Sequence, residues 1–198
     1  MSEQSGAHRF SGRASAKLAA ALDEFAVSPE GLVCADLGAN VGGFTEVLLM
    51  RGAARVYSID TGHGVLAGNL RRDARVVNME RTNALHVTLP EPMDLVVADL
   101  GWTQQRWLVP AALALLRPGS SLISLIKPHY ESDRKQLRHG VLPWDQAPAV
   151  LEDVLARLAA MGTPAVSVMK SPLLGAKGNV EFLARFCAAG AVSSSPPP

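Results

Sequence analysis

Residues 32–50, LVCADLGANVGGFTEVLLM, decide the fold of this chain. An apolar run ends at Asp36, the chain turns at Gly38, and a helical pattern of apolar residues follows Gly43. Glycine lacks a Cβ, so it permits strained turns and lets the backbone approach a ligand closely. The helix that follows directs unpaired N–H groups and a partial positive charge at the same point. The stretch therefore predicts a strand, a glycine turn and a helix that together hold an anionic or polar, nucleotide-like ligand.

The glycine spacing narrows the choice of ligand. A dinucleotide-binding GxGxxG motif starting at Gly38 would need a glycine at position 40, where the chain has Asn40. The spacing DLGAxxGGF instead resembles that of class I methyltransferases, which bind S-adenosylmethionine. An ordinary structural turn of an α/β protein stays open as an alternative. The residues of this turn expected to bind cofactor are Asp36, Gly38, Ala39, Asn40, Gly42, Gly43 and Phe44.

The size and charge of the chain indicate one domain without a general affinity for nucleic acid. With 198 residues, 48% of them hydrophobic, the chain can bury one core. We expect that domain at residues 10–188, with disordered ends at 1–9 and 189–198. The formal net charge is only +1, so any basic surface must be local.

Cysteine use and hydropathy predict a cytoplasmic protein. Cys34 and Cys187 lie in apolar runs that favour buried strands, so we expect no disulfide and a reducing compartment. The first ten residues lack the apolar core of a signal peptide. The most apolar segment, 108–126, is interrupted by Arg117-Pro118-Gly119, which argues against a membrane span.

Strand and helix patterns alternate along the chain and predict an α/β fold. A helix from Ala14 precedes the opening strand, and a turn at Gly175–Gly178 favours an antiparallel hairpin at the carboxyl-terminal edge of the sheet. We expect the helix after the fourth strand to run to Leu116 and to stop at Pro118 and Gly119. Further strands are expected at 54–59, 75–79, 93–98, 121–126, 165–169 and near Glu181, and helices at 104–116 and 147–161.

Polar residues follow the ends of several of these strands. In a doubly wound sheet, carboxyl ends of strands line the ligand crevice, and an acid such as Asp60 typically accepts the ribose hydroxyls there. Asn83 is placed to bond an adenine edge, although asparagine is also an ordinary turn residue. Asp99 and Lys127 end two further strands. Lys17, on the flank of the first helix, can reach the cleft edge or remain a surface lysine.

A basic loop at 129–146 also carries the aromatic residues Tyr130 and Trp144. Phosphate attraction combined with stacking is typical of a groove for single-stranded nucleic acid. A solvated loop explains the composition equally well. The local basic residues expected to grip RNA are Arg9, Arg13, Arg134, Lys135 and Arg138.

Four charged residues carry a family resemblance. Lys17, Asp99, Lys127 and Glu181 follow the order of the Lys-Asp-Lys-Glu tetrad of FtsJ-like RNA ribose 2′-O-methyltransferases. The resemblance is closest to the TlyA, or haemolysin A, branch over roughly residues 10–187, through the segments ASAKLAAALDEF, DLGANVGGFTEVLLMRGAARVYSID, ERTN, DLVVADL, LIKPHYE and GNVEFL. The segments that follow Asp99 (LGWTQQ) and Lys127 differ in sequence from those usual in the TlyA branch.

The resemblance implies a Rossmann-like class I methyltransferase fold, with a mostly parallel seven-stranded sheet and helices on both faces. It implies methyl transfer from S-adenosylmethionine to a ribose 2′-hydroxyl of RNA, ribosomal RNA being the family's substrate. Lys17, Asp99, Lys127 and Glu181 would be the catalytic residues, and Asp60, Asn83 and Asp99 would join the turn in binding cofactor. That family carries a small RNA-binding module before this domain, which we expect to be missing here. Either the local basic residues or a partner protein would then supply the affinity for RNA.

Lys127 is expected to orient the hydroxyl or to accept its proton. A neighbouring Lys17 ammonium would lower the pKa of Lys127, and Asp99 and Glu181 would raise it. The sequence leaves both roles open.

Three other functions remain to be weighed. The first is a non-catalytic domain that binds S-adenosylmethionine for regulation or assembly. The second is an NAD-dependent oxidoreductase, because Asp60 would serve an NAD ribose equally well; the missing glycine at position 40 counts against it. The third is a membrane-lysing protein, suggested only by the haemolysin name and supported by no apolar span or basic amphipathic helix.

Overall fold

A seven-stranded sheet forms the centre of the computed structural model, which describes residues 12–190. The strands lie in the order β3-β2-β1-β4-β5-β7-β6, and all neighbouring pairs are parallel except β5–β7 and β7–β6, so β7 runs opposite to the other strands. This arrangement confirms the predicted fold class. The strands are β1 (Val33–Leu37), β2 (Arg55–Ile59), β3 (Val76–Met79), β4 (Met93–Ala98), β5 (Leu116–Ile126), β6 (Ser167–Lys170) and β7 (Phe182–Cys187).

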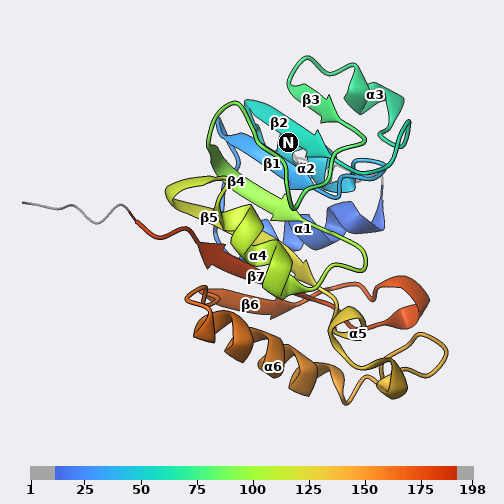
Figure 1. Cartoon of the computed structure of the whole chain (residues 1–198). Coiled ribbons are helices and arrows are strands. Elements are labelled where there is room, and N and C mark those ends of the chain that lie inside the picture. The colour runs from blue at the N-terminus through green and yellow to red at the C-terminus, as the bar shows by residue number, and fades with distance from the viewer. Residues whose placement is uncertain (1–11, 191–198) are drawn as a thin grey trace, which may run out of the picture.

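Helices cover both faces of the sheet (Figure 1). One face carries α1 (Arg13–Glu24) and α2 (Gly43–Met50), and the other carries α4 (Gln105–Leu113) and α6 (Ala147–Ala160). Short helical segments complete the chain: α3 (Gly68–Arg71), α5 (Pro128–Glu131), η1 (Arg134–Gln136) and η2 (Ala176–Gly178). The predicted disordered end at 1–9, and residues 191–198 of the disordered tail predicted at 189–198, lie outside the described residues.

Successive residues of the central strands point into two separate cores. Val96 packs on the α4 and α6 side, whereas the next residue, Val97, packs on the α1 and α2 side. Leu122 and Ile123 divide between the two cores in the same way. Because side chains alternate along a strand, a strand buried on both faces must be apolar throughout. This explains the unbroken apolar runs that end at Ala98 and at Ile126.

Strand β5 differs from its predicted form. It starts at Leu116, and α4 ends at Leu113, so the predictions of a helix to Leu116 and a strand from Ser121 were wrong. The register slips between the Met93–Leu116 and Leu95–Ser121 pairs, and the extra residues of β5 bulge there. Proline lacks an N–H, so Pro118 is tolerated in such a bulge. Proline and glycine here mark an irregular strand rather than a helix end.

The two cysteines have different environments. Cys34 is buried in β1, as predicted, but Cys187 at the end of β7 is exposed, which contradicts the second half of that prediction. Both thiols are free. Within residues 12–190, no helix combines the length and apolarity that a membrane crossing requires.

Gly42 offers a test of the packing beneath the glycine turn. Its φ is +101°, and a Cβ built on it would lie 2.2 Å from Leu70 Cδ1. Gly119 has a φ of +81° and no atom within 4 Å of such a Cβ, so a substitution there reports only the cost of a side chain in the left-handed backbone conformation. We expect Gly42→Ala to lower the free energy of unfolding by about 1–3 kcal/mol more than Gly119→Ala does, because of overpacking. Urea denaturation measures both; equal losses would contradict the packing argument.

Candidate active site

Gly38 brings the ends of β1 and β4 together. Its φ is +84°, and a Cβ at this position would lie 2.6 Å from the carbonyl oxygen of Asp99. Only glycine tolerates both the conformation and the approach. The close contact sets the Asp99 backbone directly beside the glycine turn.

The N–H groups of the turn are largely used within the protein. Those of Gly38 and Ala39 donate to the carbonyl of Ile59 at 2.8 and 3.1 Å, and that of Asn40 donates to Asp60 Oδ2 at 2.9 Å. The N–H of Thr45, in the first turn of α2, donates to Asp36 Oδ2 at 2.8 Å. The expected cradle of free N–H groups for an anion is therefore absent at these four positions. A ligand must be held here by side chains and by the shape of the cavity.

Asp36 stabilises the start of α2 from inside the protein. Its carboxylate is fully buried and also accepts the Thr45 hydroxyl at 2.7 Å, and that hydroxyl lies 2.7 Å from Ser58 Oγ. Burial raises the pKa of Asp36 to about 7, against the lowering effect of its hydrogen bonds with Thr45. A carboxylate at a helix N-terminus occupies the place where a ligand anion would bind.

The turn reaches α2 through one left-handed residue. Asn40 has a φ of +49°, a region that asparagine enters more readily than most side chains do. Val41, next to it, is exposed. This backbone path could not be read from the sequence, in which Asn40 and Val41 replace the small residue and proline usual in FtsJ-like turns.

A cavity of about 610 Å³ opens at the carboxyl ends of the parallel strands. That is the place where doubly wound sheets bind their ligands. Ala14 of α1 and Thr103 before α4 contribute to its walls. The predicted residues that line it are Gly38, Ala39, Asn40, Gly43, Phe44, Asp60, Asn83, Asp99 and Lys127. Of the ten predicted cofactor residues, Asp36 and Gly42 do not line it, since Asp36 is buried against Thr45 and Gly42 faces Leu70.

Asp60 and Asn83 keep hydrogen-bonding capacity toward the cavity. Asp60 accepts one N–H on each carboxylate oxygen, from Asn40 at 2.9 Å and from Gly62 at 2.7 Å. Each oxygen has a second acceptor site, enough for two ribose hydroxyls. Asn83 accepts the N–H of Leu85 at 3.0 Å, and its amide NH₂ makes no hydrogen bond to any of residues 12–190. That NH₂ group can donate to an adenine nitrogen.

The four tetrad residues form two ion pairs. Lys127 Nζ lies 2.6 Å from Asp99 Oδ1 and donates to the carbonyl of Leu100 at 3.2 Å. Lys17 Nζ lies 2.5 Å from Glu181 Oε2, and both side chains are buried. Asp99 and Lys127 line the cavity, whereas Lys17 and Glu181 do not. The predicted four-residue site is thus a pair at the cavity and a pair buried outside its wall.

Several segments hold the buried pair in place. A Cβ on Gly175 would lie 1.9 Å from Glu181 Oε1, so only glycine leaves room for this carboxylate. Asn179, which is 2% exposed, donates to the carbonyls of Gly140 and Ala176 and accepts the N–H of Leu142. These contacts tie the hairpin that carries Glu181 to the basic loop.

The charges of the cavity wall favour a cation. Asp60 and Asp99 contribute two carboxylates, and Lys127, paired with Asp99, contributes the single ammonium among the described lining residues. A diphosphate would meet two like charges and few free N–H groups. A ligand carrying a positive charge meets Asp60 without a competing cation.

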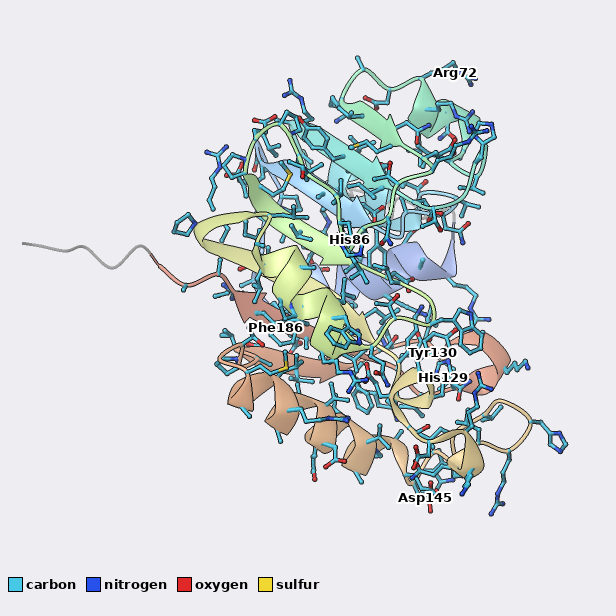
Figure 2. The ribbon with its side chains drawn as sticks, viewed as in Figure 1. Arg72, His86, His129, Tyr130, Asp145 and Phe186 are labelled. Atoms are coloured by element: carbon cyan, nitrogen blue, oxygen red, sulfur yellow. The ribbon has the colours of Figure 1, made fainter. Side chains whose placement is uncertain are left out.

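Aromatic residues near Lys127 were only partly foreseen. Tyr130 stacks on Trp102 with ring centroids 4.6 Å apart and contacts His129 at 4.2 Å, and the Lys127 ammonium lies 5.6 Å from the Tyr130 centroid. Figure 2 shows His129 and Tyr130 side by side at the start of α5. Trp102 is 84% exposed and was not among the predicted site residues, although it lies in the unusual segment LGWTQQ. Desolvation of His129 lowers its pKa to about 4, so this imidazole is neutral.

The predicted basic residues lie on the surface. Arg134, Lys135 and Arg138 are exposed in the loop after α5, and Trp144 in the same loop is 80% exposed. Arg13 donates to the carbonyl of Leu174 at 2.7 Å. Arg9 lies outside the described residues.

A family model for FtsJ-like methyltransferases matches residues 10–187. The chain belongs to the FtsJ-like methyltransferase family. S-adenosylmethionine is the cofactor of this family, and the carboxylate-lined cavity fits a sulfonium cation. The resemblance stated from the sequence is confirmed.

Individual relatives place the chain beside haemolysin A within the FtsJ-like family. It is 43% identical over 177 residues to the Mycobacterium tuberculosis 16S/23S rRNA (cytidine-2′-O)-methyltransferase TlyA, covering 86% of this chain and 65% of that protein. It is 34% identical over 184 residues to Hemolysin A of Brachyspira hyodysenteriae, covering 90% of this chain and 77% of the other. A crystal structure of a candidate hemolysin from Lactococcus lactis superposes with a TM-score of 0.86 at 31% identity, covering 92% of this chain and 90% of that one. The chain thus spans less than two thirds of the M. tuberculosis protein.

The buried Lys17–Glu181 pair can be tested by its stability. Lys17→Met leaves an unpaired buried carboxylate, which should lower the free energy of unfolding by about 3–5 kcal/mol. Arg51→Met is the matched control, because the Arg51 and Asp23 side chains are 38% and 60% exposed and such pairs contribute about 0–1 kcal/mol. The double variant Lys17→Met/Glu181→Leu should recover most of the loss in urea denaturation. A loss for Lys17→Met no greater than for Arg51→Met would show that the pair does not hold the fold.

Asp36 should make stability depend on pH. Its pKa is raised from 3.8 to about 7 in the folded protein, so the native state binds more protons than the unfolded state between these values. The contribution of Asp36 to the free energy of unfolding therefore falls as pH rises from about 4 to 7, and is constant above. Asp36→Asn stays neutral, so its stability relative to the native protein should rise over that interval. Parallel denaturation profiles for the two proteins would contradict the assignment.

Proposed function

We propose that this chain transfers a methyl group from S-adenosylmethionine to a ribose 2′-hydroxyl in RNA, with ribosomal RNA as the substrate class. The observation that carries the proposal is the Lys127–Asp99 pair on the wall of the cavity beside the glycine turn. The name of the M. tuberculosis relative, at 43% identity, states this reaction for that protein.

The cavity has the features that this cofactor requires. Asp60 retains acceptor sites for ribose hydroxyls, and Asn83 retains an NH₂ group for the adenine ring. When bound, S-adenosylmethionine supplies an activated methyl group on a positively charged sulfur. Asp60 and Asp99 would complement that charge.

Lys127 is the group that we assign to the ribose hydroxyl. Two of its contacts, to Asp99 and to the Leu100 carbonyl, fix Nζ at the cavity wall. In the amine form, Lys127 donates its two N–H groups to Asp99 and to the Leu100 carbonyl, and its lone pair is left to accept a hydrogen bond from the ribose hydroxyl and so orient it. As the hydroxyl oxygen forms its bond to the methyl carbon and the bond from that carbon to sulfur breaks, the hydroxyl proton would pass to this lone pair. The rest of the rate acceleration would come from holding the hydroxyl oxygen and the methyl group in line.

The surface beside Lys127 suits an unpaired nucleotide. Trp102 offers an exposed ring backed by Tyr130, and stacking of one base on an aromatic ring contributes about 1–3 kcal/mol. Arg134, Lys135 and Arg138 provide positive charge for phosphates. We propose that RNA approaches over the segment from Tyr130 to Trp144, with help from a partner protein where these contacts do not suffice.

The other functions fit the site less well. An NAD-dependent oxidoreductase would place a pyrophosphate against N–H groups that Ile59, Asp60 and Asp36 already occupy. A non-catalytic binding module would not need the Lys127–Asp99 pair at the cavity wall. A measurement of RNA methylation distinguishes the non-catalytic module from a methyltransferase.

Removal of Lys127 tests the proposed function. We expect Lys127→Ala and Lys127→Arg each to lower methyl transfer by at least about 100-fold, since neither replacement can accept the proton. Affinity for S-adenosylmethionine, measured calorimetrically, should survive in both. Tritiated methyl groups incorporated into fractionated cellular RNA, followed by nuclease digestion to nucleosides, report both the rate and the position of the label.

Arg117→Ala is the matched control. Arg117 is a basic residue of the same strand, at the end opposite Lys127, so its loss should leave transfer unchanged. Label on a base rather than on ribose would refute the assigned reaction. Cofactor binding without transfer to any RNA fraction would favour the non-catalytic module instead.

A further inference from the structure

The carboxylate of Glu80 holds a loop next to the cofactor cavity without lining the cavity itself. Glu80 directly follows β3, and its side chain is 9% exposed. It accepts the backbone N–H groups of three consecutive residues: Gly64 on Oε2 at 2.8 Å, and Val65 and Leu66 on Oε1 at 2.9 and 3.1 Å. Successive N–H groups that converge on one anion fix the conformation of the backbone that carries them. The loop between β2 and α3 is therefore shaped around Glu80.

Two further side chains, Arg71 and His63, approach this carboxylate. Arg71 of α3 lies 3.3 Å from Glu80 Oε1 and also donates to the carbonyl of Leu66 at 3.1 Å. His63 Nδ1 lies 3.6 Å from the other oxygen. The N–H donors, first Gly64 and then Leu66, lower the pKa of Glu80 to about 2, so it is ionised at neutral pH.

One end of the loop forms the ribose side of the cavity. Asp60 and Thr61 line the cavity, and Asp60 Oδ1 accepts the N–H of Gly62 at 2.7 Å. The segment after β3 crosses the same region, because Arg81 donates to the Gly62 carbonyl at 3.0 Å and Thr82 donates to the Asp60 carbonyl at 2.9 Å. In Figure 1, β3 and α3 lie together at this edge of the sheet. Movement of the loop would thus displace Asp60.

The other end of the loop supports the glycine turn from outside. A Cβ on Gly42 would lie 2.9 Å from Leu66 Cδ1, which places Leu66 directly against the turn. The N–H of Ala67 donates to the carbonyl of Val41 at 3.2 Å. The loop therefore contacts two separate parts of the cofactor site.

We infer that Glu80 is a positioning residue for the cofactor site, holding residues 61–67 so that Asp60 faces the ribose and Leu66 supports the glycine turn. This inference rests on the proposed function, because it assumes that the cavity binds S-adenosylmethionine. Glu80 does not line the cavity, and within residues 12–190 its carboxylate contacts only the loop and Arg71 of α3. Its loss should therefore weaken cofactor binding and leave the transfer step intact at saturating cofactor.

The experiment compares Glu80→Gln and Glu80→Ala with the control Glu91→Gln. Glu91 also accepts two hydrogen bonds, from Arg55 and Tyr57, but it does not line the cofactor cavity and accepts no backbone N–H from any of residues 12–190. Hydrogen exchange of the amides at 64–66 reports loop order directly. Calorimetric titration with S-adenosylmethionine reports affinity, and thermal unfolding shows that each variant is folded.

In both Glu80 variants we expect the amides at 64–66 to exchange at least about tenfold faster than in the native protein. We also expect the affinity for cofactor to fall at least about tenfold, which is the loss typical of one charge-assisted hydrogen bond. Glu91→Gln should change neither quantity. In the methylation assay the KM for cofactor should rise while kcat stays unchanged, a split that general destabilisation would not produce.

Unchanged exchange at 64–66 in both Glu80 variants would overturn the inference, as would faster exchange with unchanged affinity. If Glu80→Ala does not fold, the near-isosteric variant Glu80→Gln provides the test, because the NH₂ group of glutamine faces a backbone N–H and cannot accept its hydrogen bond. If the native protein itself does not bind S-adenosylmethionine, the proposed function fails, and the exchange data still decide whether Glu80 orders the loop.

Discussion

The approach of Gly38 to the Asp99 carbonyl is the constraint on which the site depends. Because a Cβ at position 38 would lie 2.6 Å from that oxygen, β1 and β4 can end side by side only with glycine there. The turn above β1 thereby shares a wall with the segment that carries Asp99. Lys127, which follows the next strand of the sheet, pairs with Asp99 on the cavity wall. The absence of a side chain at position 38 thus brings the glycine turn next to the Lys127–Asp99 pair.

The tetrad divides into a buried pair and a pair at the cavity. Lys17 and Glu181 come from opposite ends of the chain, and their contact fixes α1 against the carboxyl-terminal hairpin. Lys127 and Asp99 face the cavity, where a substrate can reach them. Since α1 also supplies Ala14 to the cavity wall, the buried pair helps to position that wall. The four charges of the family pattern therefore lie in two different environments, one buried and one at the cavity.

Much of this could be read from the sequence, for identifiable reasons. Buried parallel strands leave unbroken apolar runs, and the charged residues that end them stand out, as Asp60, Asp99 and Lys127 did. The bulge in β5 could not be read, because Pro118 and Gly119 signal an interruption without saying of which element. Nor could the sequence show that the N–H groups of the turn are already hydrogen-bonded, because their acceptors, Ile59 and Asp60, lie about twenty residues away in the chain. The exposure of Trp102 is likewise a property of tertiary packing alone.

The occupied N–H groups of the glycine turn also bear on how cofactor exchanges. A turn whose donors are already bonded within the protein has little freedom left to lose, so ligand entry carries a small ordering cost. The backbone of the turn can therefore stay in place while cofactor enters and leaves. Any conformational change would then fall to the proposed RNA substrate, because a stacked nucleotide must leave its stack before it can enter a site.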